Sequence, residues 1–515
     1  MMASALVLEN LESMAFFRPE SVLTLGVLAT FIQDLLLQRN PKRVAILTWT
    51  SLGWLAATAI ALATTGAEAR LIFGGLLVHD PLRVFFGWLF LAATALTVII
   101  VPQSDQIPHN RLGEFLALLL ALLLGMFLMA ESADLLMAYL AVEMVSIVSY
   151  VLTGFRRRER KANEAALKYV IYGGVASGIM LYGMSLLYGL FGTTRLVGLG
   201  GIGPQLADVT SRLFMAHAFG GQPAAQLALA MAVVFVLAGI GYKIAAVPFH
   251  MWCPDVYQGA PTPFTAFLSV GPKAAGFALA IRFFFAVFEK MVPGVGWVST
   301  SDLPWPAILG ILSAITMTLG NLTALVQTNL KRMFAYSSIA HAGYLLMGLA
   351  AASAAGVQAI LVYLPVYLVM NVGAFLVLIS VTKETGGEEL KDFRGLGTRA
   401  PIAALALAVF LFSLTGIPPF AGFTGKYLIF AAVLKTGGSW NYLLAVVGVI
   451  NSAISLFYYA RIVRAMFLER AVTEEKMAVP GLYNGLLTGM AALILVFGLY
   501  WTPLLQWATA AFGAT

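Results

Sequence analysis

The chain has 515 residues, of which 60% are hydrophobic and 11% are charged. A soluble domain carries about 25% charged residues, so this composition excludes an ordinary soluble enzyme. The single cysteine, Cys253, excludes disulfides within the chain, a four-cysteine iron–sulfur cluster and a C-x-x-C-H haem site. The net charge of +7 does not indicate nucleic-acid binding, because the basic residues lie in short loops between apolar runs.

Apolar runs long enough to cross a bilayer core of about 30 Å recur from end to end. They predict an all-α polytopic membrane protein with fourteen spans: 20–38, 44–64, 76–101, 112–130, 134–154, 164–191, 227–247, 262–289, 306–326, 333–351, 357–381, 401–436, 441–462 and 480–508. The first run lacks the basic segment and cleavage site of a secretory signal, so we expect it to remain as the first helix.

The loops that follow odd-numbered and even-numbered spans must lie on opposite sides of the membrane. One set of loops carries 19 Lys and Arg residues, and the other set, with adjacent span ends, carries at most six, including Arg212. Basic loops stay on the cytoplasmic or equivalent side. We therefore expect the loop FRRRERKAN at 155–163 to be cytoplasmic and both termini to lie on the opposite side.

Charges and prolines occur inside several spans. Lysines at 243 and 426 lie close to prolines that interrupt the seventh and twelfth spans, namely Pro248, Pro418 and Pro419. A proline removes a backbone donor and breaks a helix, and the freed polar groups must be satisfied by protein or water. We therefore expect discontinuous helices 7 and 12, each with a polar, hydrated pocket beside a lysine.

The sequence also repeats weakly. SYVLTG at 149–154 matches GYLLMG at 343–348, and VPFHMW at 247–252 matches PPFAGF at 418–423. An odd number of spans separates each pair, so the copies run in opposite directions, as in many transporters. One transmembrane domain over 1–515 is predicted, with three N-terminal helices in 1–111, inverted repeats in 112–290 and 306–465, and a last helix at 480–508.

Polar side chains recur at helical spacing and form stripes that could line one internal track. The stripes are Tyr139, Glu143, Ser146 and Tyr150; Ser337, His341 and Tyr344; Tyr363, Tyr367 and Asn371; and Asn451, Ser455 and Tyr458.

Three segments together resemble a known family: WCPDVYQGAPTPFTAFLSVGPKAAGF, LKRMFAYSSIAHAGYLLMG and SLTGIPPFAGFTGKYLIF. They are similar to the antiporter-like membrane subunits of complex I, above all to subunit 2, also called subunit N or B. NEAALKYVIYGG and SAISLFYYARI resemble the cyanobacterial and chloroplast version, which belongs to a plastoquinone-reducing complex.

The resemblance implies fourteen helices, two inverted five-helix units and proton half-channels joined by a hydrated axis. It implies proton translocation by Glu143, Lys243, Lys273 and Lys426, with Glu143 paired to Lys243. It also implies that this chain binds no cofactor, and that iron–sulfur clusters and quinone belong to other subunits.

Each of these residues also has a structural interpretation. Glu143 and Lys243 could form a fixed ion pair, Lys273 could bind carbonyl groups, and Lys426 could extend to one surface.

Other residues are secondary candidates. Lys168 either extends to the surface or tunes Lys243, His341 is either a core histidine or a relay, and His250 lies at the first break. We expect Arg83 to form a surface pair with Asp80, three residues before it.

Together with the resemblance, these features predict a proton-translocating subunit of a quinone-reducing complex I. The resemblance alone implies plastoquinone as the quinone and the thylakoid membrane as the location. The partners of this chain would be other membrane and hydrophilic subunits, lipids and protons. The alternatives are a cation/proton antiporter of the same fold, a solute carrier with broken helices, and a purely structural membrane subunit.

Overall fold

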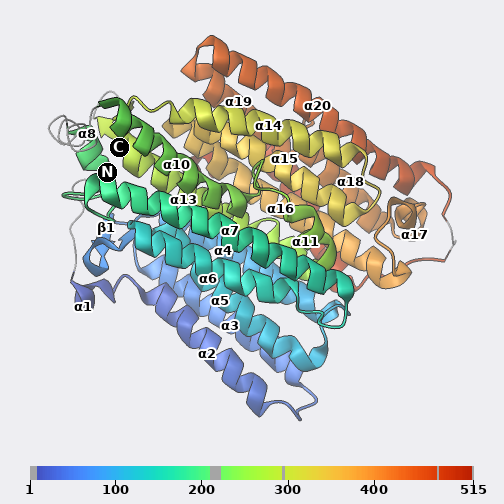
Figure 1. Ribbon diagram of the computed structural model, residues 1–515. Helices are drawn as coiled ribbons and strands as arrows, with labels where there is room; N and C mark the ends of the chain where they lie inside the picture. Colours follow the sequence, from blue (N-terminus) through green and yellow to red (C-terminus); the bar gives the residue numbers. More distant parts are fainter. Residues whose placement is uncertain (1–8, 209–221, 293–295, 472–474, 513–515) are drawn as a thin grey trace.

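The computed structural model describes residues 9–208, 222–292, 296–471 and 475–512, so Arg212 of the charge count lies outside the described residues. Long helices run side by side through the molecule (Figure 1). Among the described residues, twelve helices are long and apolar enough to cross a membrane. The predicted all-α membrane fold is therefore confirmed.

The N-terminal part contains three long helices and a small hairpin. Its elements are α1 (Asn10–Ser13), α2 (Arg18–Leu36), α3 (Arg43–Thr64), β1 (Arg70–Ile72), η1 (Phe73–Gly75), β2 (Leu77–His79), α4 (Pro81–Ile100), η2 (Val101–Gln103) and η3 (His109–Arg111). The start of the predicted span 76–101 is wrong, because residues 77–79 pair with 70–72 as an antiparallel strand. Helix α4 begins only after Asp80, whose side chain accepts a hydrogen bond from the amide of Arg83 and so caps the helix.

The middle part continues with α5 (Leu112–Glu131), α6 (Leu135–Thr153), α7 (Arg160–Phe191), α8 (Ile202–Ala207), α10 (Gln222–Ile244), α11 (Cys253–Gly259), α12 (Thr262–Leu268) and α13 (Gly271–Phe288). A second hairpin, β3 (Glu289–Val292) and β4 (Gly296–Ser299), leads into the C-terminal part. The predicted span 262–289 is two helices, because the chain leaves helical geometry at Val270.

The C-terminal part contains α14 (Trp305–Leu325), α15 (Leu330–Ala350), α16 (Ala354–Thr385), η4 (Leu390–Phe393), α17 (Leu396–Arg399), α18 (Pro401–Thr415), α19 (Ala421–Thr436), α20 (Ser439–Leu468), α21 (Gly481–Leu499) and α22 (Thr502–Ala511). The predicted span 480–508 is interrupted between α21 and α22. Helix α22 packs back on α4, where the rings of Trp507 and Phe85 lie 4.1 Å apart.

The two predicted spans that are not among the twelve are 333–351 and 401–436, which coincide with α15 and with the pair α18–α19. Helix α15 carries many polar side chains, and α18 and α19 are each short. Membrane crossing by these two stays a prediction, and so does the total of fourteen.

Several features agree with the predicted repeat. Helices α7 and α16 are both 32 residues long. Each ends at a glycine in the left-handed conformation, Gly192 and Gly386, which occupy equivalent positions in the two copies. The seventh and twelfth spans are both broken, as α10–α11 and α18–α19.

The centre of the molecule is formed by α12–α13 and α16, whose apolar windows are each 94% buried. The outer helices are much more exposed: the corresponding windows are 33% buried in α2 and 22% in α21. Their exposed side chains are apolar, as expected for surfaces that face lipid or neighbouring subunits. Polar groups on α13, α15 and α16 therefore lie in the interior.

The sidedness of the loops can be tested with cysteine labelling, because the native Cys253 is fully buried. We expect Arg158→Cys, in the exposed loop after α6, to react with a membrane-impermeant maleimide only from the cytoplasmic side. Ala67→Cys, in the exposed loop after α3, should react only from the opposite side. Labelling of both variants from one side would refute the predicted topology.

Candidate functional site

Lys243 lies at the end of α10, where the first broken helix is interrupted. Its side chain is 1% exposed, and its Nζ donates a hydrogen bond to Ser146 Oγ of α6 at 2.8 Å. The expected contact pair of Glu143 with Lys243 is not formed among the described residues. Glu143 lies one turn before Ser146 on the same helix, and its Oε1 is buried without a hydrogen bond.

The break after Lys243 is held by protein groups. The chain turns at Ala245, which has φ of 60°, and resumes as α11. The freed carbonyl of Tyr242 accepts a hydrogen bond from the Trp252 indole at 3.1 Å, and the amide of Val247 donates to Thr316 Oγ1 at 3.1 Å. These contacts satisfy backbone groups that an interrupted helix would leave unpaired in a membrane.

Lys273 lies in the first turn of α13 and is 3% exposed. Its Nζ donates to Ser338 Oγ of α15 at 2.5 Å and lies 5.8 Å from the centre of the Tyr257 ring. The Tyr257 hydroxyl also bonds Ser338 Oγ, at 3.0 Å. Lys273 is thus bound by side chains of α15 and α11, and among the described residues it has no carbonyl acceptor.

Lys426 lies on α19, just beyond the second break, and is 2% exposed. Its Nζ donates to the carbonyl of Thr415, the last residue of α18, at 2.9 Å and to Ser452 Oγ at 3.1 Å. It also lies 4.3 Å from the centre of the Tyr344 ring. A cation at a helix C-terminus and over an aromatic face is favourably placed. Because it points inward, the interpretation that it extends to a surface is wrong.

A line of polar side chains on α15 connects these two lysines. Ser338, His341 and Tyr344 follow one another at intervals of three residues, and the first and last contact Lys273 and Lys426. His341 Nδ1 is 2.6 Å from the Tyr363 hydroxyl of α16, and its Nε2 is 3.4 Å from the Tyr459 hydroxyl of α20. We call Lys273, Ser338, His341, Tyr344 and Lys426 the α15 stripe.

Two secondary candidates lie away from this stripe. Lys168 is 38% exposed and binds Asp255 at 2.6 Å and Glu164 at 2.8 Å, so it does not contact Lys243. His250 lies within the first break and is 5% exposed, with its Nδ1 buried and without a hydrogen bond. Neither belongs to the α15 stripe.

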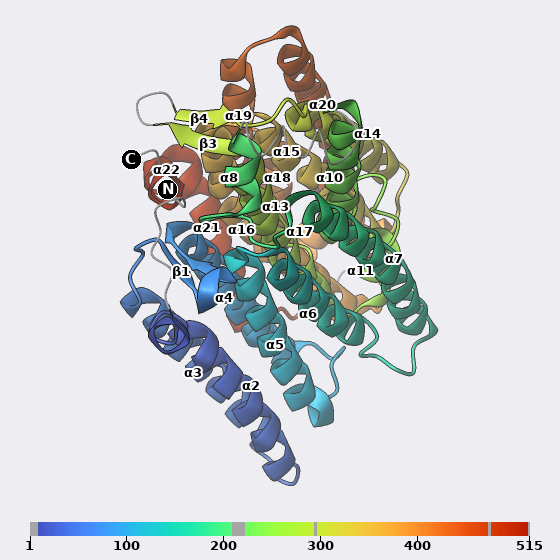
Figure 2. The ribbon, with the colours of Figure 1, turned by 60° about the vertical axis from the view of Figure 1, so that its left-hand side comes forward.

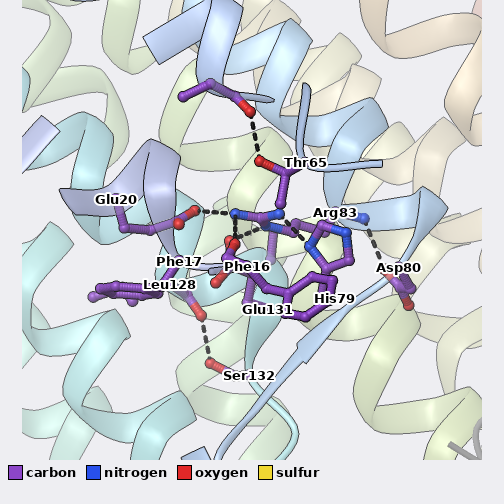
Figure 3. Close-up of polar contacts among 12 residues, drawn as sticks. Phe16, Phe17, Glu20, Thr65, His79, Asp80, Arg83, Leu128, Glu131 and Ser132 are labelled. Carbon is purple, nitrogen blue, oxygen red and sulfur yellow. Dashed lines mark hydrogen bonds and ion pairs between the residues drawn. The ribbon is translucent and has the colours of Figure 1, made fainter. Parts of the chain in front are cut away.

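Sequence reasoning missed a buried ionic cluster at the end of the bundle that holds the β1–β2 hairpin. Arg83 is fully buried and does not form the expected surface pair with Asp80. Its guanidinium lies between Glu20 of α2 and Glu131 of α5 (Figure 3), and Asp80 instead binds Arg282 of α13 with both oxygens, at 2.7 and 2.8 Å. The available signal was that Glu20, Arg83 and Glu131 all occur at ends of predicted helices that lie on the same side.

A second missed pair lies at the opposite end. Lys331 was counted among the loop charges, yet its side chain is fully buried at the start of α15. It binds Glu388 at 2.7 Å and the carbonyl of Ala260 at 3.2 Å. The charge count that predicts sidedness therefore includes a residue with a structural partner.

The arrangement as a whole defines a class of protein. It is a polytopic helical membrane protein whose interrupted helices place lysines in the interior, which is the construction of many secondary transporters. Residues 132–455 match the family described as NADH:quinone oxidoreductase/Mrp antiporter, transmembrane.

Curated relatives and solved structures narrow this class. The chain is 56% identical to NADH-quinone oxidoreductase subunit N of Anaeromyxobacter sp. (strain Fw109-5) over 98% of both chains. It is 41% identical to NAD(P)H-quinone oxidoreductase subunit 2 of Microcystis aeruginosa over 92% of this chain and 87% of the relative. A chain of respiratory complex I from Thermus thermophilus is 31% identical, with a TM-score of 0.74 over 95% of this chain and 98% of that one. The protein belongs to the subunit N family of the antiporter-like membrane subunits of NADH-quinone oxidoreductase.

One of the structural matches comes from a different kind of complex. A chain of the Mrp complex from Dietzia sp. gives a TM-score of 0.74 at 22% identity, covering 96% of both chains. At this identity, the likeness shows a shared fold only.

The packing of α19 against α16 provides a test of how tightly the stripe is held. A methyl group on Gly425 would lie 2.2 Å from Tyr363 Cδ2, so Gly425→Ala must displace the ring that binds His341. We expect it to reduce the free energy of unfolding by about 1–3 kcal/mol and to lower the melting temperature of the purified complex. Gly178→Ala, on an exposed face of α7 with no atom within 4 Å, should leave the melting temperature unchanged or slightly raised. Equal melting temperatures for the two variants would contradict the close packing.

Proposed function

We propose that this chain is a proton-translocating membrane-arm subunit of a quinone-reducing complex I. The family membership supports the assembly, since relatives and a structural neighbour carry the names of complex I subunits. The observation that carries the proton role is the α15 stripe, in which two buried lysines contact one face of α15 with His341 between them. Buried lysines with no counter-charge in the membrane interior are costly, and such residues mark ion pathways.

The chemistry of the stripe suits protons better than larger solutes. Lysine, serine, tyrosine and histidine side chains can each accept a proton and pass one on. The groups are single residues in a row, and the side chains of the stripe are almost completely buried. A solute carrier would need a larger cavity at this depth.

Lys243 and Glu143 are proposed as the entry to this pathway. A carboxylate near Lys243 favours its charged form, and separating the two favours release of the proton. Because Lys243 is bound to Ser146 in this structure, the proposed step is an exchange of Lys243 between Ser146 and Glu143. Gly276 of α13 lies against the Lys243 side chain, because a methyl group added to Gly276 would lie 3.3 Å from Lys243 Cγ. The entry therefore adjoins the helix that carries Lys273.

The redox chemistry is assigned to other subunits. We propose that this chain binds no cofactor and that iron–sulfur clusters and quinone belong to partner subunits. Plastoquinone and a thylakoid location stay predictions. Identity to the Anaeromyxobacter chain is 56% and to the Microcystis chain 41%, and this difference favours an NADH-quinone oxidoreductase over the cyanobacterial type of complex.

A cation/proton antiporter of the same fold is the second candidate, favoured by the fold shared with the Mrp complex. The same lysines could serve it. Purification of the assembly separates the two candidates: hydrophilic iron–sulfur subunits should accompany the chain in a complex I, and a cation/proton antiporter would lack them.

Lys426 offers a direct test of the proton role. Lys426→Met keeps much of the buried volume but removes the amine. The carbonyl of Thr415 stays hydrogen-bonded to Ser452 Oγ, at 2.6 Å, so the break keeps its support. We expect normal assembly on native gels and at least roughly a tenfold loss of proton pumping per electron in proteoliposomes. Lys435→Met, on an exposed turn of the same helix, should pump normally. Assembly with unimpaired pumping in Lys426→Met would refute the proposal.

His341 tests whether the stripe itself conducts. His341→Phe keeps a ring among Tyr344, Tyr363 and Tyr367 but removes the nitrogen that bonds Tyr363. We expect proton pumping to fall while quinone reduction persists, measured by dye quenching and NADH oxidation in the same vesicles. His109→Phe, at an exposed position, serves as the control. Unchanged pumping would make His341 a packing residue.

A further inference from the structure

The buried cluster around Arg83 contains more negative than positive charge. Glu20 and Glu131 have fully buried side chains, and both contact the guanidinium of Arg83 (Figure 3). Arg83 Nη2 donates to Glu20 Oε1 at 2.6 Å, and Arg83 Nε donates to Glu131 Oε1. One guanidinium therefore faces two carboxyl groups.

The neighbouring groups do not supply the missing positive charge. Arg282 of α13 is bound by both oxygens of Asp80, so this pair is neutral as a unit. His79 Nδ1 contacts Arg83 Nη1. Since arginine can only donate, His79 Nδ1 must be the acceptor, and its Nε2 carries the hydrogen that is donated to the carbonyl of Gly66 at 3.1 Å.

His79 is therefore neutral. Burial, together with the positive charge of Arg83, lowers the pKa of His79 to about 4. Arg70 of β1 lies over the Phe16 ring and is paired with Glu68 at 2.7 Å, so its charge is already matched by a carboxylate. The cluster thus has one uncompensated negative charge if both glutamates are ionised.

The hydrogen bonds show the same deficit. The second oxygens, Glu20 Oε2 and Glu131 Oε2, are buried and have no hydrogen-bond partner among the residues that the structure describes. Both carboxyl groups contact the same guanidinium, so two buried carboxyl groups share one small cation. Burial of two carboxylates against one cation disfavours ionisation of both, and a proton on one would provide a donor for an unpartnered oxygen.

We propose that Glu20 and Glu131 form a proton-binding site beside Arg83, in which the two carboxyl groups share one proton. The site joins α2, α4 and α5 at the end of the bundle that carries the β1–β2 hairpin. It shares no residue with the α15 stripe, and it does not depend on the proposed pumping role. The proton is the ligand, and the pair titrates as one unit.

Infrared spectroscopy of the intact purified complex at neutral pH tests this site. A protonated carboxyl group gives a C=O stretching band that shifts in D₂O. We expect Glu131→Gln to lose one such band and Glu20→Gln to lose the same band, because the carboxylate that remains then has Arg83 to itself. Glu68→Gln, which removes an exposed carboxylate, should keep the band.

Three results would overturn the proposal. If neither glutamine variant loses a band, both glutamates are ionised. If only one variant loses it, a fixed neutral glutamic acid is present instead of a shared proton.

Arg83→Gln gives a second measurement if a glutamine variant does not assemble. Without the cation, both carboxyl groups should be protonated and the band should about double. An unchanged band in Arg83→Gln would also refute the site.

Discussion

The structure depends on how a lysine ammonium group is accommodated away from water. Transfer of an unpaired charge into a low-dielectric interior is so costly that the group must find oxygen partners or lose its proton. Lys243, Lys273 and Lys426 each have oxygen partners, and none of them contacts a carboxylate of the residues that the structure describes. Hydroxyl and carbonyl oxygens hold the amine without fixing its charge. A carboxylate at the same distance would hold it as a permanent cation.

An interrupted helix provides such an oxygen for one of these lysines, and neighbouring helices provide the others. At the second break, α18 ends at Thr415 and its free carbonyl becomes an acceptor for Lys426. At the first break, by contrast, Trp252 and Thr316 take up the freed backbone groups, and Lys243 turns to Ser146 on a neighbouring helix. The two halves of the molecule thus use similar breaks in different ways. Only at the second break does a lysine bind the carbonyl at the end of the interrupted helix.

Much of this arrangement could be predicted from the sequence, and the failures have physical causes. Apolar length predicts the helices, and prolines next to lysines predict the breaks at α10–α11 and α18–α19, because both signals are local. Which charged residues pair with one another does not depend on the neighbouring sequence alone. The sequence placed Arg83 with Asp80, three residues away, whereas three-dimensional packing brings Glu20 and Glu131 to Arg83 and Arg282 to Asp80.

The sequence could not identify the contact partner of Lys243 for a related reason. Helical spacing places Glu143 and Ser146 on one face of α6, but it cannot say which of them meets the lysine. The predicted stripe of Ser337, His341 and Tyr344 on α15 was more informative, because one helix face can be read directly from the chain. The serine that meets Lys273 is nevertheless the next residue, Ser338, whereas Ser337 bonds the Tyr459 hydroxyl of α20. What the sequence could not show is that this face lies between Lys273 and Lys426.

The serine and tyrosine links of the stripe have a consequence for turnover. A hydroxyl that receives a proton on one side and passes one on from the other ends with its O–H bond pointing the opposite way. If the stripe conducts protons as proposed, Ser338 must therefore rotate back before a second proton can follow, and while Tyr257 and Lys273 occupy its oxygen that rotation is hindered. The proposed pathway would then carry charges one at a time and be reset between them, and its throughput would be governed by how fast hydroxyl groups turn.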